Sequence, residues 1–349
     1  MINLMFHDDW EIYGDGTGDP EVLMYEPARI ILDICDTYGA KYTFYAEIGQ
    51  QLNMMNAPGT SKWRKYAKIW EEVLKDAVQR GHDVQLHFHP QWIDAKLKND
   101  TWELDYSKWN TGTIEYELLD EWIGKGASYL RNLLKPINDE YDVVSYRAGG
   151  WMCQPSSNLH NVLKKHDILC DVSVIKGRYR VYADGSKVDF SYAHSHFEPW
   201  ETHPDDFAKE QKGSGIIEFP VYSEVSYLPN YVYLLMKSFR PMYYYDILKK
   251  RKERLERDIR YSPKLIKQGK KKDYYGSFGY MHYKHLLHIV NNIKNNRVNG
   301  TVPDYIIFLT HSKSFMSYKN FENLISKLSQ DNDVSFTTMR SYVKKYLTL

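Results

Sequence analysis

Hydrophobic and polar positions in the first half of the chain alternate between two spacings. Short runs rich in apolar and aromatic residues at 3–8, 41–47 and 82–87 predict strands. Between them, residues 21–38 and 61–80 carry apolar side chains at helical spacing, and each of these stretches is followed by a glycine, which commonly ends a helix. Strands separated by helices in this way favour a parallel sheet with crossover helices.

The alternation resumes after an interruption at residues 91–113, which hold three tryptophans among polar residues and which we interpret as an insertion at the rim of the fold. A second interruption, residues 222–297, is polar and is predicted to be a mainly helical, basic insertion before the last strands. The remaining predicted elements are helices at 114–134, 157–166 and 320–328, and strands at 143–146, 169–174, 216–221, 305–310 and 334–337. Because the strand at 305–310 must return to the sheet, one domain over residues 1–349 is favoured over two.

Composition excludes several classes of protein. The 349 residues carry 46 Lys and Arg against 45 Asp and Glu, a balance that does not point to nucleic acid. The longest apolar runs are far shorter than the roughly 20 residues that a transmembrane helix needs. The N-terminus is read as a first strand and not as a signal peptide. Three cysteines fit neither a disulfide framework nor a CxxC metal motif, so we expect a reducing, cytoplasmic compartment.

A dense run of Lys and Arg extends from Lys249 to Lys272 with few acidic residues. Such runs are usually solvated faces of helices. The alternative is peripheral electrostatic contact with an anionic membrane, a glycolipid or a phosphate-bearing substrate.

Candidate metal ligands lie where predicted strands end. His87 and His89 are two residues apart, so they project to the same side if the strand extends that far. Imidazole suits zinc, nickel, cobalt or iron, and Asp9, at the end of the first strand, supplies a third ligand. His-x-His alone is equally compatible with ordinary histidines. The position of Asp8, Asp9, His87, His89 and His311 at strand carboxyl ends, which meet at one edge of a parallel sheet, favours the metal interpretation.

Six short motifs, in order, resemble the NodB-type polysaccharide deacetylase family, carbohydrate esterase family four in a broad sense. They are FHDDW at 6–10, YGAKYTFY at 38–45, GHDVQLH at 81–87, SYRAGGW at 145–151, LCDVSV at 169–174 and LTHS at 309–312. The resemblance implies that Asp8 is the catalytic base, Asp9 a metal ligand, Arg147 the group that holds the base, Asp171 the residue that orients Arg147, and His311 the general acid. It also implies a distorted (β/α) barrel of about seven parallel strands.

The sequence departs from that family at the metal site. The family's second histidine, four residues after the first, is replaced by Gln91, so either His89 or the amide oxygen of Gln91 completes the site. Glu11 follows the Asp pair where a glycine is usual, and Glu11 and Glu47 could reach the metal. These departures resemble a divergent branch near surface-polysaccharide and lipopolysaccharide biosynthesis proteins.

The expected function is therefore metal-dependent hydrolysis, with zinc as the first choice of ion, of an acetyl group on an N- or O-acetylated sugar in a surface-polysaccharide or glycolipid precursor. Trp92 and Trp151 are candidate platforms for the sugar, although tryptophans also fill cores. Two other functions remain open: a glycoside hydrolase on a related barrel, which needs two carboxylates flanking the sugar bond, and a non-catalytic carbohydrate-binding relative.

Overall fold

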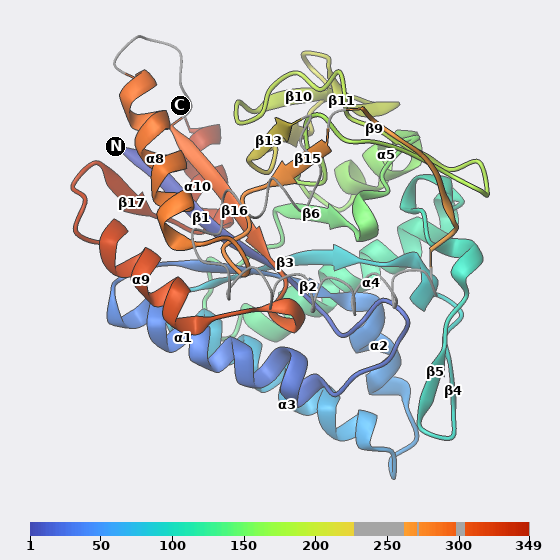
Figure 1. The fold of residues 1–349 in the computed structure, drawn as a ribbon. Coiled ribbons are helices and arrows are strands. Elements are labelled where there is room, and N and C mark those ends of the chain that lie inside the picture. Colours follow the sequence, from blue (N-terminus) through green and yellow to red (C-terminus); the bar gives the residue numbers. More distant parts are fainter. Residues whose placement is uncertain (227–261, 271, 298–303, 349) are drawn as a thin grey trace.

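A computed structural model describes residues 1–226, 262–270, 272–297 and 304–348 (Figure 1). Its main sheet has ten strands. They are β1 (Ile2–Trp10), β2 (Tyr42–Glu47), β3 (Asp83–Phe88), β6 (Ser145–Ala148), β7 (Cys170–Asp171), β10 (Trp200–His203), β11 (Asp206–Glu210), β12 (Ile217–Glu218), β16 (Tyr305–Thr310) and β17 (Val334–Phe336).

The sheet is parallel over most of its width and curls into a half-barrel. Its order is β11-β10-β12-β7-β6-β3-β2-β1-β16, with β17 also paired to β1. Pairing is parallel from β12 to β16, whereas β10 and β11 are antiparallel additions beyond β12. The predicted parallel α/β fold is confirmed. The parallel run from β12 to β16 has seven strands, close to the expected number, but β17 and the antiparallel β10 and β11 extend the sheet beyond it.

The open side of the half-barrel, between β12 and β16, is crossed by isolated backbone hydrogen bonds. Just beyond β12, the Tyr222 amide donates to the Ile307 carbonyl of β16, 3.1 Å away. The Leu309 amide donates in turn to the Gly276 carbonyl at 3.0 Å. No strand of the described residues completes this side of the sheet. The segment that contains Gly276, distant in sequence from β12, helps to close it.

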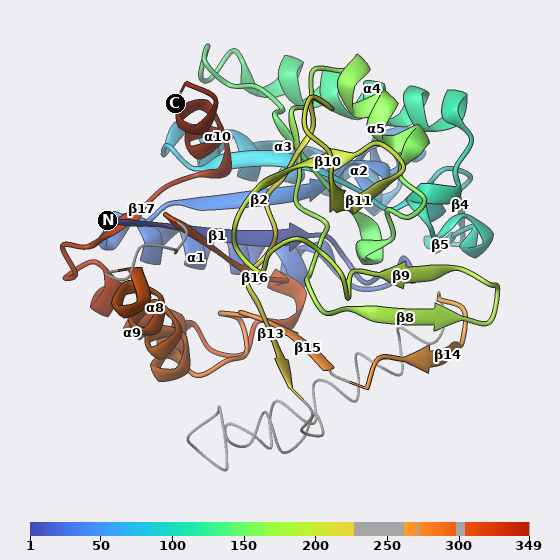
Figure 2. The ribbon, with the colours of Figure 1, turned by 90° about the horizontal axis from the view of Figure 1, so that it is seen from above.

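Helices cover the outer face of the sheet. They are α1 (Glu26–Thr37), α2 (Ile48–Asn56), α3 (Lys62–Gln79), α4 (Tyr116–Leu134), α5 (Ser157–Lys165), α8 (Tyr283–Arg297), α9 (Tyr318–Leu328) and α10 (Met339–Leu347). Of these, α1, α3 and α9 lie along one side of β1, β2 and β3 (Figure 1), and the two termini lie near one another (Figure 2). None of the described helices is long and apolar enough to cross a membrane.

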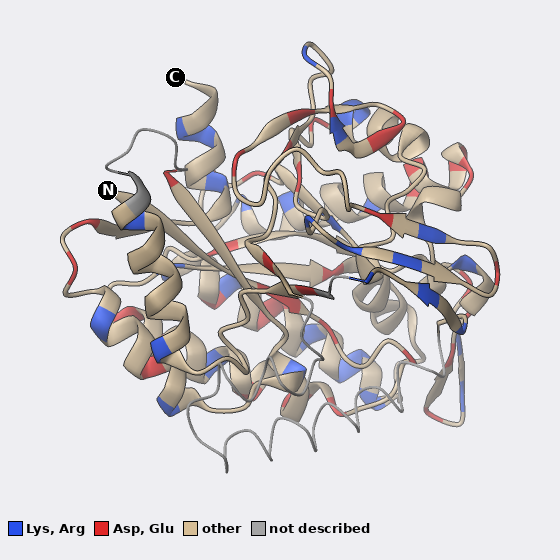
Figure 3. Cartoon of the chain, turned by 45° about the horizontal axis from the view of Figure 1, so that its top comes forward, with Lys and Arg blue, Asp and Glu red and all other residues tan. Residues whose placement is uncertain are grey.

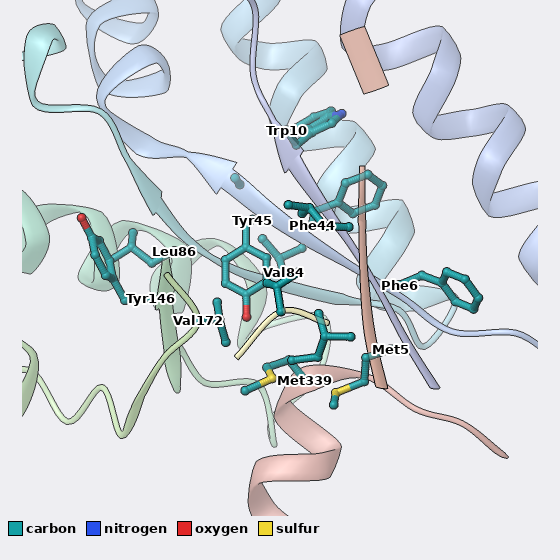
Figure 4. Packing of buried hydrophobic residues seen from close by; sticks show 14 of the residues in the cluster. Met5, Phe6, Trp10, Phe44, Tyr45, Val84, Leu86, Tyr146, Val172 and Met339 are labelled. Atoms are coloured by element: carbon teal, nitrogen blue, oxygen red, sulfur yellow. The ribbon is translucent and has the colours of Figure 1, made fainter. Parts of the chain in front are cut away.

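The side chains of β1 alternate between this helical layer and the interior of the curled sheet. Phe6 packs edge-on against Phe321 of α9, with ring centroids 5.6 Å apart, and Trp10 packs 5.7 Å from Trp70 of α3. Figure 4 shows Phe6, Trp10 and Phe44 in this core. The residues between them, at odd positions, therefore face the interior, because side chains alternate along a strand.

The first insertion, 91–113, is built from the short hairpin β4 (Lys96–Lys98) and β5 (Thr101–Glu103) with 3-10 turns before and after it. Its three tryptophans, Trp92, Trp102 and Trp109, are buried. This interruption thus packs onto the fold with its own aromatic side chains.

The second insertion differs in its described part from the mainly helical expectation. It contains β13 (Ser223–Ser226), β14 (Leu265–Gln268) and β15 (Lys272–Tyr275) before α8. β13 pairs with β15, and β14 joins β8 (Tyr179–Tyr182) and β9 (Lys187–Asp189) in a three-stranded sheet. Of the basic run from Lys249 to Lys272, residues 249–261 and 271 lie outside the described residues.

Candidate active site

Strand register brings polar residues into one layer inside the curled sheet. Asp9 is paired with Tyr45 of β2. Glu47, at the end of β2, is paired with His87 of β3, which is itself paired with Arg147 of β6. Carboxyl ends of parallel strands meet at the same edge of a sheet, so these four strands place their last polar side chains together.

Four of these interior residues form a compact group that we call the Glu–His cluster: Glu11, Glu47, His87 and His89. Each is buried and offers one ligand atom, and the four atoms lie within 4.8 Å of one another. His89 Nε2 lies 3.1 Å and His87 Nε2 3.8 Å from Glu11 Oε2. Two imidazoles and two carboxylates at this separation are a donor set that suits zinc or another first-row divalent ion.

Within the described residues, two buried ligand atoms of the Glu–His cluster, His87 Nε2 and Glu47 Oε2, have no hydrogen-bond partner. The other nitrogen of His87, Nδ1, is 2.9 Å from the Arg147 carbonyl oxygen, which holds the ring with Nε2 directed to the cluster. Metal-bound histidines commonly hydrogen-bond a carbonyl in this way. Buried polar atoms normally find partners, so these residues fit a bound cation.

The acidic and basic groups of the Glu–His cluster shift one another's pKa values. Burial raises the pKa of Glu47 to about 7, partly offset by the two histidines. Burial lowers the pKa of His87, but Asp9 and Glu11 outweigh it and raise the value to about 9. Burial opposes ionisation of Glu11, yet His89 and Lys313 hold its pKa well below the usual range. At neutral pH His87 is therefore protonated, and its positive charge lies where a cation would fit.

Two further contacts fix the positions of the cluster. The Lys313 ammonium donates to Glu11 Oε1 at 2.7 Å and to the Ile12 carbonyl at 3.0 Å. Gly149 packs so closely on His89 that a Cβ atom there would lie 2.5 Å from the ring. Only glycine leaves room for His89 in this orientation.

Asp9 belongs to a second group beside the cluster. Arg147 Nη1 donates to Asp9 Oδ1 at 2.8 Å, and Asp9 Oδ2 lies 3.4 Å from His311 Nε2. The buried guanidinium also donates from Nη2 to His7 Nδ1 at 3.0 Å and lies 4.3 Å from the Tyr45 ring centroid. Asp9 is therefore not among the four closest potential ligands, but it is held between a guanidinium and an imidazole.

Asp8 projects to the opposite side of β1, toward the helical layer. It accepts hydrogen bonds from the Ser312 amide at 2.8 Å and from the Ser312 hydroxyl. Burial raises the pKa of Asp8 to about 7, and the bonds from Ser312 limit the rise. Adjacent residues of a strand point to opposite faces, so Asp8 and Asp9 cannot both reach the interior.

Asp171 and Glu218 form a buried carboxyl pair behind Arg147. Asp171 accepts from the Ser173 amide and hydroxyl, each at 2.8 Å, and Glu218 accepts from the Val174 amide at 3.0 Å. Burial raises the pKa of both, and that of Glu218 well above its usual value because Asp171 adds to the effect. Asp171 also interacts electrostatically with Arg147.

The candidate sugar platforms differ from one another. Trp92 is 2% exposed and packs 5.5 Å from Trp102, so it serves the core of the first insertion. Trp151 lies between two guanidiniums, with the Cζ atoms of Arg147 and Arg178 at 5.5 Å and 5.0 Å from its ring. Gln91 Nε2 donates to the Gly14 carbonyl at 3.3 Å, and its Oε1 is buried without a hydrogen-bond partner.

Several residues of the site were not identified from the sequence. Glu218 was missed although it is an acidic residue within the apolar run 216–221, a pattern that marks a buried polar group. Lys313 and His7 carry no comparable signal, because only the tertiary structure brings them to Glu11 and Arg147.

No protein-family model matches the chain. No curated protein matches it either.

Solved structures resemble it in fold. A putative glycoside hydrolase/deacetylase from Parabacteroides distasonis matches with a TM-score of 0.56 at 11% identity, covering 99% of this chain and 71% of that chain. A GH57 branching enzyme from Thermococcus kodakaraensis matches with a TM-score of 0.53 at 11% identity, over 99% and 71%. An allantoinase matches with a TM-score of 0.50 at 9% identity, over 99% and 89%. At such identities the likeness is one of fold.

Proposed function

We propose that this protein is a metal-dependent hydrolase that removes an acetyl group from an N- or O-acetylated sugar. The observation that carries the proposal is the convergence of four buried donor atoms within 4.8 Å of one another beside a carboxylate fixed by a guanidinium. The fold, shared with a putative glycoside hydrolase/deacetylase, is compatible with this chemistry.

In this proposal Glu11, Glu47, His87 and His89 hold a divalent ion, with zinc as the first choice. A bound zinc ion polarises a carbonyl and lowers the pKa of a water molecule to roughly 7. His89, and not Gln91, completes the donor set, because its Nε2 lies 3.1 Å from Glu11 whereas Gln91 donates to a backbone carbonyl. Glu11 and Glu47 thus take the role of metal ligand that the sequence analysis assigned to Asp9.

Asp9 is the proposed base, a role that the sequence resemblance gave to Asp8. Arg147 fixes Asp9 Oδ1, which leaves Oδ2, near His311, to accept a proton from the attacking water. His311 delivers a proton to the nitrogen or oxygen of the leaving sugar as the bond to the acetyl carbon breaks and acetate forms. Asp8 faces Ser312 on the other side of β1 and takes no part in proton transfer.

Arg147 is the positioning residue of this site, and Asp171 with Glu218 supports it electrostatically. Arg147 is fully buried, so its charge requires compensation. Asp9 supplies one direct partner, and Asp171 contributes through its charge from behind. The arrangement keeps the guanidinium directed at Asp9 while the reaction proceeds.

The decisive experiment measures acetate release and metal content in the same preparations. We expect the zinc-loaded protein to release acetate from at least one member of a panel of acetylated monosaccharides, nucleotide sugars and lipid-linked oligosaccharides. His87→Ala should lose metal and activity together. Asp9→Asn should retain metal but lose activity by about 10²- to 10⁴-fold, the usual contribution of a general base.

Asp8→Asn is the matched control, because it makes the same chemical change one residue away on the opposite face of β1. It should retain both metal and acetate release. Loss of release in Asp8→Asn with retention in Asp9→Asn would reverse the assignment, and stoichiometric metal in His87→Ala would overturn the metal site. Cleavage of aryl glycosides without acetate release would favour a glycoside hydrolase instead.

A further inference from the structure

A second group with unbalanced charge lies beside Trp151, and we call it the Arg pair: Arg178, which is buried, and Arg180, which is half-buried. Arg178 is 3% exposed, and its Nε and Nη2 lie 2.8 Å and 2.7 Å from Asp273 Oδ2. Its third nitrogen, Nη1, is buried and has no hydrogen-bond partner among the residues that the structure describes. Asp273 therefore satisfies one edge of the guanidinium and leaves the other unsatisfied.

Arg180 adds a second positive charge to the same carboxylate. Asp273 acts electrostatically on both arginines, so two guanidiniums share one negative charge. Arg180 bonds to the Tyr182 side chain, but its Nε atom is buried without a hydrogen-bond partner in the described part of the chain. Arg180 lies in β8 and Arg178 directly before it, where the Phe190 amide donates to the Arg178 carbonyl and so extends the pairing with β9 by one residue. Two residues apart in extended backbone, the two arginines project to the same side.

The Arg pair is connected to the proposed catalytic residues through one indole ring. Trp151 has Arg178 Cζ at 5.0 Å and Arg147 Cζ at 5.5 Å, and Arg147 holds Asp9. Trp151 is a non-glycine residue at φ 67°, a backbone conformation that persists only where the surroundings impose it. β8 and β9 lie on the side toward which β1 points (Figure 2).

A buried excess of positive charge is unfavourable unless an anion neutralises it. Arginine is the side chain best suited to bind carboxylates and phosphates, because its planar donors match their oxygens. Figure 3 shows further basic residues gathered on the three-stranded sheet that contains β8. The missing partner is therefore expected to be an oxyanion and not a neutral sugar hydroxyl.

We propose that the Arg pair and Trp151 form an anion subsite that binds the carboxylate or phosphate group of an acidic acetylated sugar. This proposal rests on the function proposed above and narrows its substrate to an N- or O-acetylated sugar that carries a negative charge near the acetyl group. Trp151 provides the apolar surface between the anion and the acetyl group, and Asp273 orients the Arg178 guanidinium.

Binding is tested first without catalysis, on the full chain, with inorganic phosphate and with glucuronate as separate probes. Calorimetry and thermal unfolding should detect saturable binding of at least one of them, and the stronger probe identifies the anion. Arg180→Gln should weaken that binding by about 10-fold or more, since a hydrogen bond to a charged group is lost. Lys187→Gln is the control for general screening, because it removes one positive charge from the neighbouring strand β9.

Catalytic selectivity is tested next, by comparing kcat/KM for N-acetylglucosamine, its 1-phosphate and an N-acetylated uronic acid. We expect Arg180→Gln to lower the ratio of kcat/KM for the anionic substrate to kcat/KM for the neutral sugar by about 10-fold. Equal binding of both probes by Arg180→Gln and the unmodified protein, or absence of binding by both, would overturn the subsite. Anion binding that Arg180→Gln weakens, without acetate release from any substrate, would retain the subsite and reject the hydrolase.

Discussion

The Glu–His cluster and the Arg pair both place charged side chains inside the fold, but the acidic groups lie in the first and the basic excess in the second. The first concentrates two carboxylates and two imidazoles in the interior, and the second places two guanidiniums around one carboxylate. Each leaves buried polar atoms without partners, Glu47 Oε2 and His87 Nε2 in one and Arg178 Nη1 in the other. Under the two proposals above, the first group would bind a cation and the second an anion.

The two groups also differ in how they tolerate the absence of a ligand. Histidine can take up a proton, and the raised pKa of His87, about 9, supplies positive charge to the cluster at neutral pH. Arginine cannot release its proton at neutral pH, so among the described residues the Arg pair depends on Asp273 for its negative charge. The Arg pair should therefore be the more sensitive of the two to loss of its internal partner.

Removal of that partner is expected to give the largest change in stability. Asp273→Asn keeps the shape of the side chain but leaves Arg178 as a buried charge without compensation, so we expect a loss of about 3–5 kcal/mol in the free energy of unfolding. Urea denaturation measures this loss, and added phosphate should restore part of it. Glu103→Gln, which breaks an exposed ion pair with Lys98, should cost less than about 1 kcal/mol. A similar small cost for Asp273→Asn would contradict the comparison.

At Asp8 the buried carboxyl group is neutralised in a third way, by taking up a proton itself. Its pKa is about 7 in the folded protein and 3.8 by reference, so the folded state binds the extra proton between these values. Stability conferred by this proton should fall as pH rises from about 4 to 7, by an amount on the order of 4 kcal/mol.

Asp8→Asn should abolish this pH dependence, because the amide can accept from the Ser312 amide without ionising. The variant should match the unmodified protein below pH about 4 and exceed it in stability above pH about 7. Urea unfolding at a series of pH values, in metal-free buffer, measures the difference. A constant difference across that range would show that Asp8 does not titrate as described.

Metal affinity tests the Glu–His cluster. Glu47→Gln removes one of two carboxylates while preserving the bond from the Gly49 amide, which is 2.8 Å long. We expect zinc affinity to fall by more than about 100-fold, beyond the 10- to 100-fold typical of residues that only support a ligand. Competition with a chelator measures the affinity. Glu140→Gln, on the exposed surface, is the matched control, and equal affinities for the two variants would exclude Glu47 as a ligand.

The smallest expected effect is a steric one on the same cluster. Gly149→Ala adds a Cβ atom 2.5 Å from the His89 ring, which must move away from Glu11. Zinc affinity should fall by about 10-fold while His87 and the glutamates still bind. Gly59→Ala, where nothing lies within 4 Å of an added Cβ, should leave affinity unchanged. No change in Gly149→Ala would indicate that His89 is not a ligand.

The predicted elements of the parallel core lie close to the observed ones, because each carries its own apolar periodicity. Residues 82–87, for example, predicted β3, which is observed at Asp83–Phe88. The short antiparallel strands β8 to β11 and the helix α2 were not predicted. The strands of these hairpins are only three to five residues long, too short to carry a clear alternation of apolar and polar positions. The helix α2 begins at Ile48, directly after the last residue of β2, with no loop to separate the two.

The sequence by itself determined that acidic residues, histidines and an arginine end neighbouring parallel strands, and so that a polar site lies at one edge of the sheet. It also held the alternation that separates Asp8 from Asp9. Tertiary structure decided which side of β1 faces the interior, because only packing against Phe321 and Trp70 directs the even positions outward. That choice directs Asp9 and Glu11 toward Arg147 and the histidines, and Asp8 toward Ser312. Likewise, only the folded chain brings Arg178 beside Trp151, since residue 151 lies in the turn after β6 and residue 178 lies just before β8.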